Sequence, residues 1–286
     1  MNNPVKNKID LTKIVELNAL LNKNRLHTVC VSARCPNKSE CFGKKTAAFL
    51  ILGDICTRSC RFCSVRKNAA PALLDNDEPG RIADFVGELG LEHVVITSVT
   101  RDDLPDGGAS QFARTIQALR AKVPTPIIEV LIPDFQLDHE ALDILLAAQP
   151  DIFNHNVETV PRLYSTVRPE ADYQRSLKVL KYGKQKNQSL ITKSGLMLGL
   201  GEEEKEVVAV LQDLRRANCD LVVLGQYFQP TKSNMPVARY LSREEFKHFE
   251  KVAGNMGFLA VASGPTMRSS YLAKELYHKI KGSYKL

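Results

Sequence analysis

The chain lacks several features that mark large classes of protein. No stretch of its 286 residues is long and apolar enough to span a bilayer, and the start, Met1 to Lys6, has no apolar region of the kind that signal peptides carry. We therefore expect no membrane association and a cytoplasmic location, although a processed organelle protein would share these features. No run of lysine or arginine resembles a nucleic-acid-binding arm, and aromatic residues do not interleave with basic ones, so we expect no nucleic-acid partner. The absence of tryptophan excludes nothing.

The composition is that of a folded protein. Hydrophobic residues make up 44% of the chain and charged residues 25%, without internal repeats or low-complexity segments, so we expect a sizeable core rather than disorder. The formal net charge of +7 favours an anionic partner, although general solubility explains it equally well.

Short apolar segments alternate along the chain with segments of helical length, which predicts an α/β fold with a parallel sheet. Six or seven such units favour a partial (β/α)6-type, TIM-like barrel, with an open doubly wound sheet as the alternative. We predict strands at 46–52, 93–97, 127–132, 152–156, 190–198, 221–224 and 258–262, and helices at 79–90, 109–122, 138–148, 173–186, 202–218 and 243–256.

Three parts are expected along the chain. Residues 1–45 form an N-terminal cysteine-rich extension, in which the spacing of apolar residues from Ile9 to Leu21 suits a short helix. Residues 46–262 form the barrel, and residues 263–286 form a C-terminal segment that caps the barrel mouth.

Cysteine is the most informative residue type. Six of the seven cysteines lie between Cys30 and Cys63, and in a cytosolic chain such crowding indicates metal binding before disulfides. Cys219 stands alone and is most simply a packed thiol.

Cys56, Cys60 and Cys63 are spaced C-x3-C-x2-C in the loop after the first predicted strand. Zinc sites usually take four ligands, whereas three cysteines on a tight loop suit a 4Fe–4S cluster with one open iron. An open iron is what S-adenosylmethionine (SAM) needs in order to bind and be cleaved to a carbon radical by an electron from the cluster. The spacing resembles the defining motif of the radical SAM superfamily, and a zinc site is the less favoured alternative.

Cys30, Cys35 and Cys41 are spaced C-x4-C-x5-C ahead of the barrel and predict a second cluster. Together with this triad, further motifs make the chain similar to the lipoyl synthase family from about residue 26 to residue 271. The segments that carry the similarity are Cys35-Pro36-Asn37, Cys56 to Cys63, Thr100 to Ala109, Val130 to Asp134, Asn154 to Thr159, Thr192 to Gly195, Gly199 to Glu202, Gln226-Tyr227 and Arg268-Ser269-Ser270-Tyr271.

The resemblance implies a sulfurtransferase that inserts two sulfur atoms at the sixth and eighth carbons of an octanoyl group, bound to a lysine of a lipoyl carrier domain. It implies two 4Fe–4S clusters and two SAM molecules per lipoyl group. The implied ligands are Cys56, Cys60 and Cys63 for the cluster that cleaves SAM, and Cys30, Cys35, Cys41 and Ser270 for the auxiliary cluster that supplies the sulfur. Without the resemblance, Ser269 and Ser270 would be interpreted as the N-cap of a helix over 271–280.

The resemblance also implies partners. These are octanoylated carrier domains, namely 2-oxoacid dehydrogenase E2 subunits and the glycine cleavage H protein, together with an electron donor and an iron–sulfur carrier for cluster repair. The positive charge agrees with an acidic carrier domain.

Five residues are candidate SAM contacts: Phe62, Gly107, Gly108, Asn154 and Glu158. Phe62 lies where related enzymes carry an aromatic side chain beside the adenine, and the glycines would let the backbone approach the methionine end. Ordinary packing and a turn before a helix are the alternatives for these three. Asn154 and Glu158, together with Asn156, close the fourth strand near the barrel mouth, where a supporting role is the alternative.

Two charged residues in the later strands and loops are weaker candidates for a functional role. Lys193 shares a strand face with glycines, which would leave room for it inside a barrel. Arg168, in the loop before the next helix, could meet a carboxylate or phosphate, but the expected state is a solvated side chain. Other functions stay open, namely sulfur insertion into RNA or free dethiobiotin by another radical SAM enzyme, and a zinc-stabilised barrel that only binds an anionic partner. The Arg-Ser-Ser-Tyr motif speaks against the first two, and metal content would separate the third.

Overall fold

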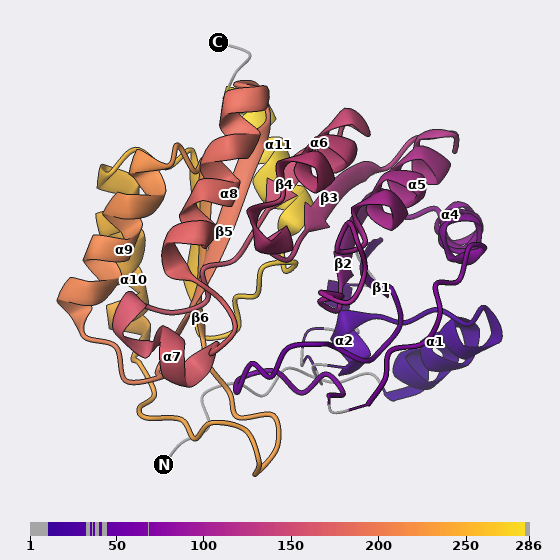
Figure 1. Cartoon of the computed structure of the whole chain (residues 1–286). Helices are drawn as coiled ribbons and strands as arrows, with labels where there is room; N and C mark the ends of the chain where they lie inside the picture. The colour runs from indigo at the N-terminus through magenta and orange to yellow at the C-terminus, as the bar shows by residue number, and fades with distance from the viewer. Residues whose placement is uncertain are drawn as a thin grey trace. The chain divides into compact units, whose positions relative to one another are not determined.

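The computed structural model describes residues 11–32, 35, 37, 40–41, 45–67 and 69–283. Ile9, at the start of the expected amphipathic stretch, and Pro36, in the first cysteine motif, lie outside these residues. Two compact units divide the chain (Figure 1). The first runs up to Arg58 and from Val65 to Asp151, and the second comprises Ser59–Ser64 and the chain from Ile152 onwards.

The first unit is built on three parallel strands in the order β1-β2-β3. These are β1 (Thr46–Ile51), β2 (His93–Ser98) and β3 (Ile127–Leu131). Their apolar and β-branched residues suit a pleated surface buried on both faces, and all six residues of β1 are buried. The helices of this unit are α1 (Leu11–Lys23), α2 (Val29–Ser32), α4 (Glu78–Leu89), α5 (Ala109–Arg120), the 3-10 turn η1 (Phe135–Leu137) and α6 (His139–Ala147). Figure 1 shows α4, α5 and α6 following one another beside the strands.

The second unit has four parallel strands in the order β4-β5-β6-β7. These are β4 (Ile152–Asn154), β5 (Ile191–Leu198), β6 (Leu221–Gln226) and β7 (Ala260–Gly264). Its helical elements are η2 (Pro161–Leu163), α7 (Tyr164–Val167), α8 (Tyr173–Lys186), α9 (Glu204–Arg216), α10 (Arg243–Asn255) and α11 (Ala273–Ser283).

Strand β6 shows how the second unit buries two faces. Val222 and Leu224 belong to the core that α8, α9 and α10 complete, whereas Leu221 and Val223 pack with Leu276 of α11 and with the first residues of the neighbouring strands. Because side chains alternate along a strand, α8–α10 cover the outer face of these strands and α11 packs on the inner face.

The predicted strands and the long helices are confirmed, with small differences at their ends. Pro79 lies in the first turn of α4, which begins one residue earlier than predicted, at Glu78, and Gly90, at φ 57°, ends the helix as the sequence predicts. Strand β7 begins at Ala260, two residues later than predicted, because Gly257 at φ 84° turns the chain and Phe258 packs into the core of the outer face. In the described part of the chain, no helix combines the length and apolar character needed to cross a membrane.

Candidate active site

The loop that carries Cys56, Cys60 and Cys63 begins with a sharp change of direction after β1. Leu52 and Gly53 both have positive φ angles, of 70° and 91°. The base of the loop is closed by a hydrogen bond from the Cys56 backbone N–H to the Arg66 carbonyl, with an N–O distance of 2.9 Å. The first cysteine therefore sits at a fixed point beside the carboxyl end of β1, the end at which parallel α/β folds place their chemistry.

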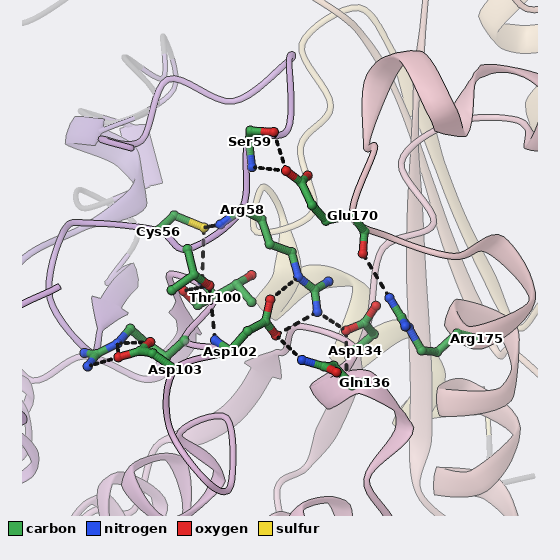
Figure 2. Close-up of polar contacts among 12 residues, drawn as sticks. Cys56, Arg58, Ser59, Thr100, Asp102, Asp103, Asp134, Gln136, Glu170 and Arg175 are labelled. Carbon is green, nitrogen blue, oxygen red and sulfur yellow. Dashed lines mark hydrogen bonds and ion pairs between the residues drawn. The ribbon is translucent and has the colours of Figure 1, made fainter. Parts of the chain in front are cut away.

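The Cys56 sulfur accepts two backbone hydrogen bonds, from the N–H of Arg58 at 3.5 Å and from the N–H of Thr100 at 3.3 Å (Figure 2). Peptide N–H donors aimed at sulfur stabilise a thiolate, and hydrogen bonds to the sulfurs tune iron–sulfur clusters. The surroundings of Cys56 therefore fit a thiolate that binds iron.

Thr57 ties the same loop to the segment after β2. Its N–H and its hydroxyl both donate to the Thr100 carbonyl at 3.0 Å, and its Oγ1 accepts from the Asp102 N–H at 3.1 Å. Arg101, next to Thr100, donates to the Leu52 carbonyl at 3.2 Å and lowers the pKa of Asp103 through their ion pair. Residues 100–103 thus hold both the start and the first cysteine of the loop.

Arg58 links the loop to a third strand end. Its Nε and Nη2 form a bidentate pair with Asp102, at 2.7 and 2.9 Å, and Nη2 also contacts Asp134 Oδ1 at 2.7 Å (Figure 2). Arg58 is only 5% exposed and Asp134 is fully buried. Burial lowers the pKa of Arg58, but the hydrogen bonds and charges of the two carboxylates outweigh it and raise the pKa. Gln136 completes the network, with its side-chain amide on Asp102 and its backbone N–H on Asp134.

The next part of the loop, Ser59–Ser64, belongs to the second unit. Ser59 donates to the Glu170 carboxylate, and the Arg61 N–H donates to the Val167 carbonyl at 2.9 Å. Asn234 donates to the carbonyls of Arg61 and Cys63, at 3.1 and 2.9 Å. Hydrogen bonds between this part of the loop and Glu170, Val167 and Asn234 therefore position the turn that contains the other two cysteines.

The structure gives Phe62 and the two glycines clear packing roles. Phe62 packs against the core of the outer face of the second unit. Gly107 and Gly108 have φ angles of 59° and 93°, and a Cβ on Gly107 would meet the Phe135 ring at 2.8 Å. Asp106 accepts from the N–H groups of Gly108 and Ser110, so it caps the start of α5; these bonds outweigh burial and lower its pKa. A turn before a helix thus accounts for the glycines, and contact with SAM stays a prediction for all three residues.

The end of β4 carries the other two candidate SAM contacts. Asn154 is fully buried. Glu158, at φ 65°, pairs its backbone with β5 and accepts from Asn156 Nδ2 at 3.1 Å. Removal from water raises the pKa of Glu158, although the charge of Arg168 and the bond from Asn156 oppose this.

The expectation of a solvated Arg168 is wrong. The side chain is 8% exposed and donates to the carbonyls of Asn156 and Val157, at 3.1 and 3.2 Å. It braces the loop after β4 by donating to two consecutive carbonyls, of which that of Val157 also accepts from the Tyr164 hydroxyl at 2.7 Å. Lys193 is fully buried and shares a strand face with Gly195, as its alternation predicts.

The first cysteine triad lies close to α2. Cys30 is buried in that helix, and its carbonyl accepts from the Cys35 N–H at 3.0 Å. Cys41 is half-buried, and its N–H donates to the carbonyl of the buried Asn37 at 3.0 Å. Within the described residues, no three cysteine, histidine or carboxylate side chains gather tightly enough to hold one metal ion. A 4Fe–4S cluster makes a different demand, because its irons take separate cysteines, so the six cysteines stay predicted ligands.

Cys219 has a different environment, as the sequence predicts. It is fully buried, its thiol donates to the Leu221 carbonyl at 3.3 Å, and burial raises its pKa to about 12. Cys219 is therefore a protonated, packed thiol, in contrast to Cys56, whose sulfur accepts hydrogen bonds.

The comparisons with known proteins agree with this geometry. The model of the radical SAM superfamily matches residues 50–214. The lipoyl synthase of Caldanaerobacter subterraneus subsp. tengcongensis is 54% identical over 257 residues, which are 90% of each chain. That of Aquifex aeolicus is 53% identical over 267 residues, or 93% of this chain and 96% of the relative. The chain belongs to the lipoyl synthase family.

Solved structures support the fold expected for the lipoyl synthase family. Methylornithine synthase superposes with a TM-score of 0.54 at 13% identity, covering 82% of this chain and 80% of the other. HydG, a maturase of the FeFe-hydrogenase, gives a TM-score of 0.58 at 16% identity, covering 81% of this chain and 54% of the other. Seven parallel strands that follow chain order within each unit, together with these neighbours, confirm the partial TIM-like barrel.

Sequence reasoning missed the residues that hold the lipoyl synthase family motifs in place. Arg58, Asp102 and Asp134 were visible only as parts of three separate motifs, 44 and 76 residues apart, and nothing in the sequence paired them. The N-cap interpretation of Ser269 and Ser270 is wrong, because α11 begins only at Ala273.

Proposed function

We propose that the protein inserts sulfur at the sixth and eighth carbons of an octanoyl group bound to a lysine of a lipoyl carrier domain. Two findings support this proposal: relatives named lipoyl synthase that share more than half of its residues, and a cysteine at the barrel mouth whose sulfur accepts two backbone N–H bonds. The second finding is the one that supports the proposed chemistry, because a sulfur that accepts two backbone N–H bonds suits a thiolate ligand of iron.

The proposed division of roles follows the parts of the chain. Cys56, Cys60 and Cys63 in the barrel, 46–262, would hold the cluster at which SAM is cleaved. The auxiliary ligands would be Cys30, Cys35 and Cys41 in the extension, 1–45, and Ser270 in the C-terminal segment, 263–286. When bound, the two clusters and SAM supply the carbon radical and both sulfur atoms, with two SAM molecules used per lipoyl group.

The residues around the first cysteine have definable tasks in this scheme. Thr100 and Arg58 aim their N–H groups at the Cys56 sulfur. The ion pairs of Arg58 hold the residue that carries one donor, and the bonds from Thr57 to the Thr100 carbonyl hold the residue that carries the other. A serine oxygen is a poorer iron ligand than a thiolate, which suits Ser270 if its iron must be released when sulfur leaves the auxiliary cluster.

The proposed partners are octanoylated E2 subunits of 2-oxoacid dehydrogenases and the glycine cleavage H protein. An electron donor and an iron–sulfur carrier would serve the two clusters. A reducing cytoplasm is the proposed location, because six thiolates committed to iron must be kept from forming disulfides.

Substitution of one triad at a time tests the division of roles. Reconstituted protein would be given SAM, a reductant and an octanoylated carrier peptide, and 5′-deoxyadenosine and the peptide mass would be measured. Variants Cys30→Ala, Cys35→Ala and Cys41→Ala should cleave SAM without adding sulfur, whereas Cys56→Ala should do neither. Cys219→Ala is the matched control. That thiol is buried and belongs to neither triad, so the variant should retain both activities. Loss of SAM cleavage in the first three variants, with the other cluster present, would contradict the proposal.

A further inference from the structure

The segment before α11 lies against two glycines of the second unit. A Cβ on Gly225 of β6 would overlap the Met267 carbonyl, and a Cβ on Gly195 of β5 would come within 2.9 Å of the Ser269 hydroxyl. Neither glycine has a positive φ angle, so backbone conformation does not require them. Glycine inside a strand marks a place where another backbone approaches closely. At Gly225 the approaching backbone is that of Met267, whereas at Gly195 the space is filled by the side chains of Ser269 and Asn156.

Ser269 is fixed at this place by a side-chain contact with the end of β4. Its Oγ lies 2.8 Å from Asn156 Nδ2 and 3.0 Å from Asn156 Oδ1, so the hydroxyl faces the whole amide group. Asn156 is 8% exposed, and its Nδ2 also donates to Glu158. A contact between partly buried groups of this kind resists exchange with water more than a surface contact does.

The adjacent residue, Ser270, differs from Ser269 in its hydrogen bonding. Its hydroxyl makes no hydrogen bond to any residue in the described ranges, and its side chain is partly exposed. The neighbouring Arg268 is held by its own contacts, to the Met267 and Pro265 carbonyls and over the Phe228 ring at 5.3 Å. The chain is therefore anchored up to Ser269 and presents the next hydroxyl without a partner.

We propose that Ser269 is a positioning residue, which anchors the Arg-Ser-Ser-Tyr segment on Gly195 and Gly225 through Asn156 and so presents Ser270 for iron binding. The anchor itself is a property of the metal-free chain, whereas the task of Ser270 rests on the proposed function. The two adjacent serines thus divide the work: one holds the segment and the other is the ligand.

Hydrogen–deuterium exchange of the metal-free, full-length chain tests the anchor. In Ser269→Ala and Gly195→Ala, the amides of residues 266–272 should exchange roughly tenfold faster, as the loss of one or two hydrogen bonds implies. Gly264→Ala is the matched control, because its added Cβ would make only an ordinary 3.6 Å contact with Met267 Cγ. Ser269→Thr keeps the hydroxyl and should restore slow exchange. Unchanged exchange in both Ser269→Ala and Gly195→Ala would overturn the anchor.

The link to Ser270 is tested in the reconstituted protein. Ser269→Ala should still form 5′-deoxyadenosine but should add at least about fivefold less sulfur to the octanoyl peptide, because the segment that carries Ser270 is less often in place. Ser269→Thr should recover sulfur insertion. Faster exchange with undiminished sulfur insertion would overturn that link. If the unsubstituted protein makes no lipoyl product, the proposed function fails, and the exchange result alone decides the anchor.

Discussion

Replacement of Arg58 by methionine should destabilise the fold far more than the loss of an ordinary ion pair. The guanidinium is 5% exposed and contacts two carboxylates, of which Asp134 is fully buried and Asp102 has a side chain 26% exposed. An exposed pair is worth about 0–1 kcal/mol, whereas removal of one partner from a buried pair costs about 3–5 kcal/mol because a buried charge is left alone. We therefore expect Arg58→Met to lower the free energy of unfolding by about 3–5 kcal/mol, nearly all of it through Asp134.

Urea unfolding of the metal-free chain, followed by circular dichroism, measures this cost. The matched control is Arg216→Met, which removes a guanidinium that is 72% exposed and paired with Asp213, and it should cost about 0–1 kcal/mol. Adding Asp134→Asn to Arg58→Met should recover part of the loss, because no buried carboxylate then remains. An Arg58→Met cost no greater than that of Arg216→Met would refute the claim that a buried ion pair holds the cysteine loop.

Three further predictions concern other parts of the molecule. Burial raises the pKa of Cys219 from 9.0 to about 12, so its stabilising effect should be complete below pH 9 and lost as the pH rises from 9 towards 12; peptide mapping at about pH 8 should find it alkylated by iodoacetamide only in urea. Gly257→Ala should lower the free energy of unfolding by roughly 1–2 kcal/mol, because only its φ angle of 84° is unfavourable. Gly108→Ala should cost roughly 1–3 kcal/mol more, because its Cβ would also overlap Leu52. Equal costs for the two variants would contradict the packing argument. With a net charge of +7, the association rate with an acidic carrier domain should fall as salt is raised, and a salt-independent rate would rule out electrostatic steering.

The strands could be predicted because each is a short apolar run between turn residues, and this pattern is local in the chain. The end of α4 was predictable for the same reason, since Pro79 and Gly90 act on their own backbone. The start of β7 was not, because Phe258 is as apolar as the strand residues and only the turn at Gly257 excludes it from the strand.

The side-chain contacts of the site could not be predicted from local patterns. Asp134 and Arg58 are 76 residues apart, and Ser269 and Asn156 are 113 apart, so only the fold brings each pair together. Arg168 was expected to be solvated because arginine in a loop usually is, but here its buried side chain donates to two backbone carbonyls of the loop after β4. The cysteine triads stood out because their chemistry depends on spacing within a single loop.

Iron and acid-labile sulfide in the anaerobically reconstituted protein test the central claim most directly, with Cys56→Ala and Cys30→Ala prepared in parallel. Two four-iron clusters predict about eight irons and eight sulfides per chain in the unsubstituted protein and about four in each variant. About four irons in the unsubstituted protein, left unchanged by Cys30→Ala, would contradict the auxiliary cluster and with it the proposed source of sulfur.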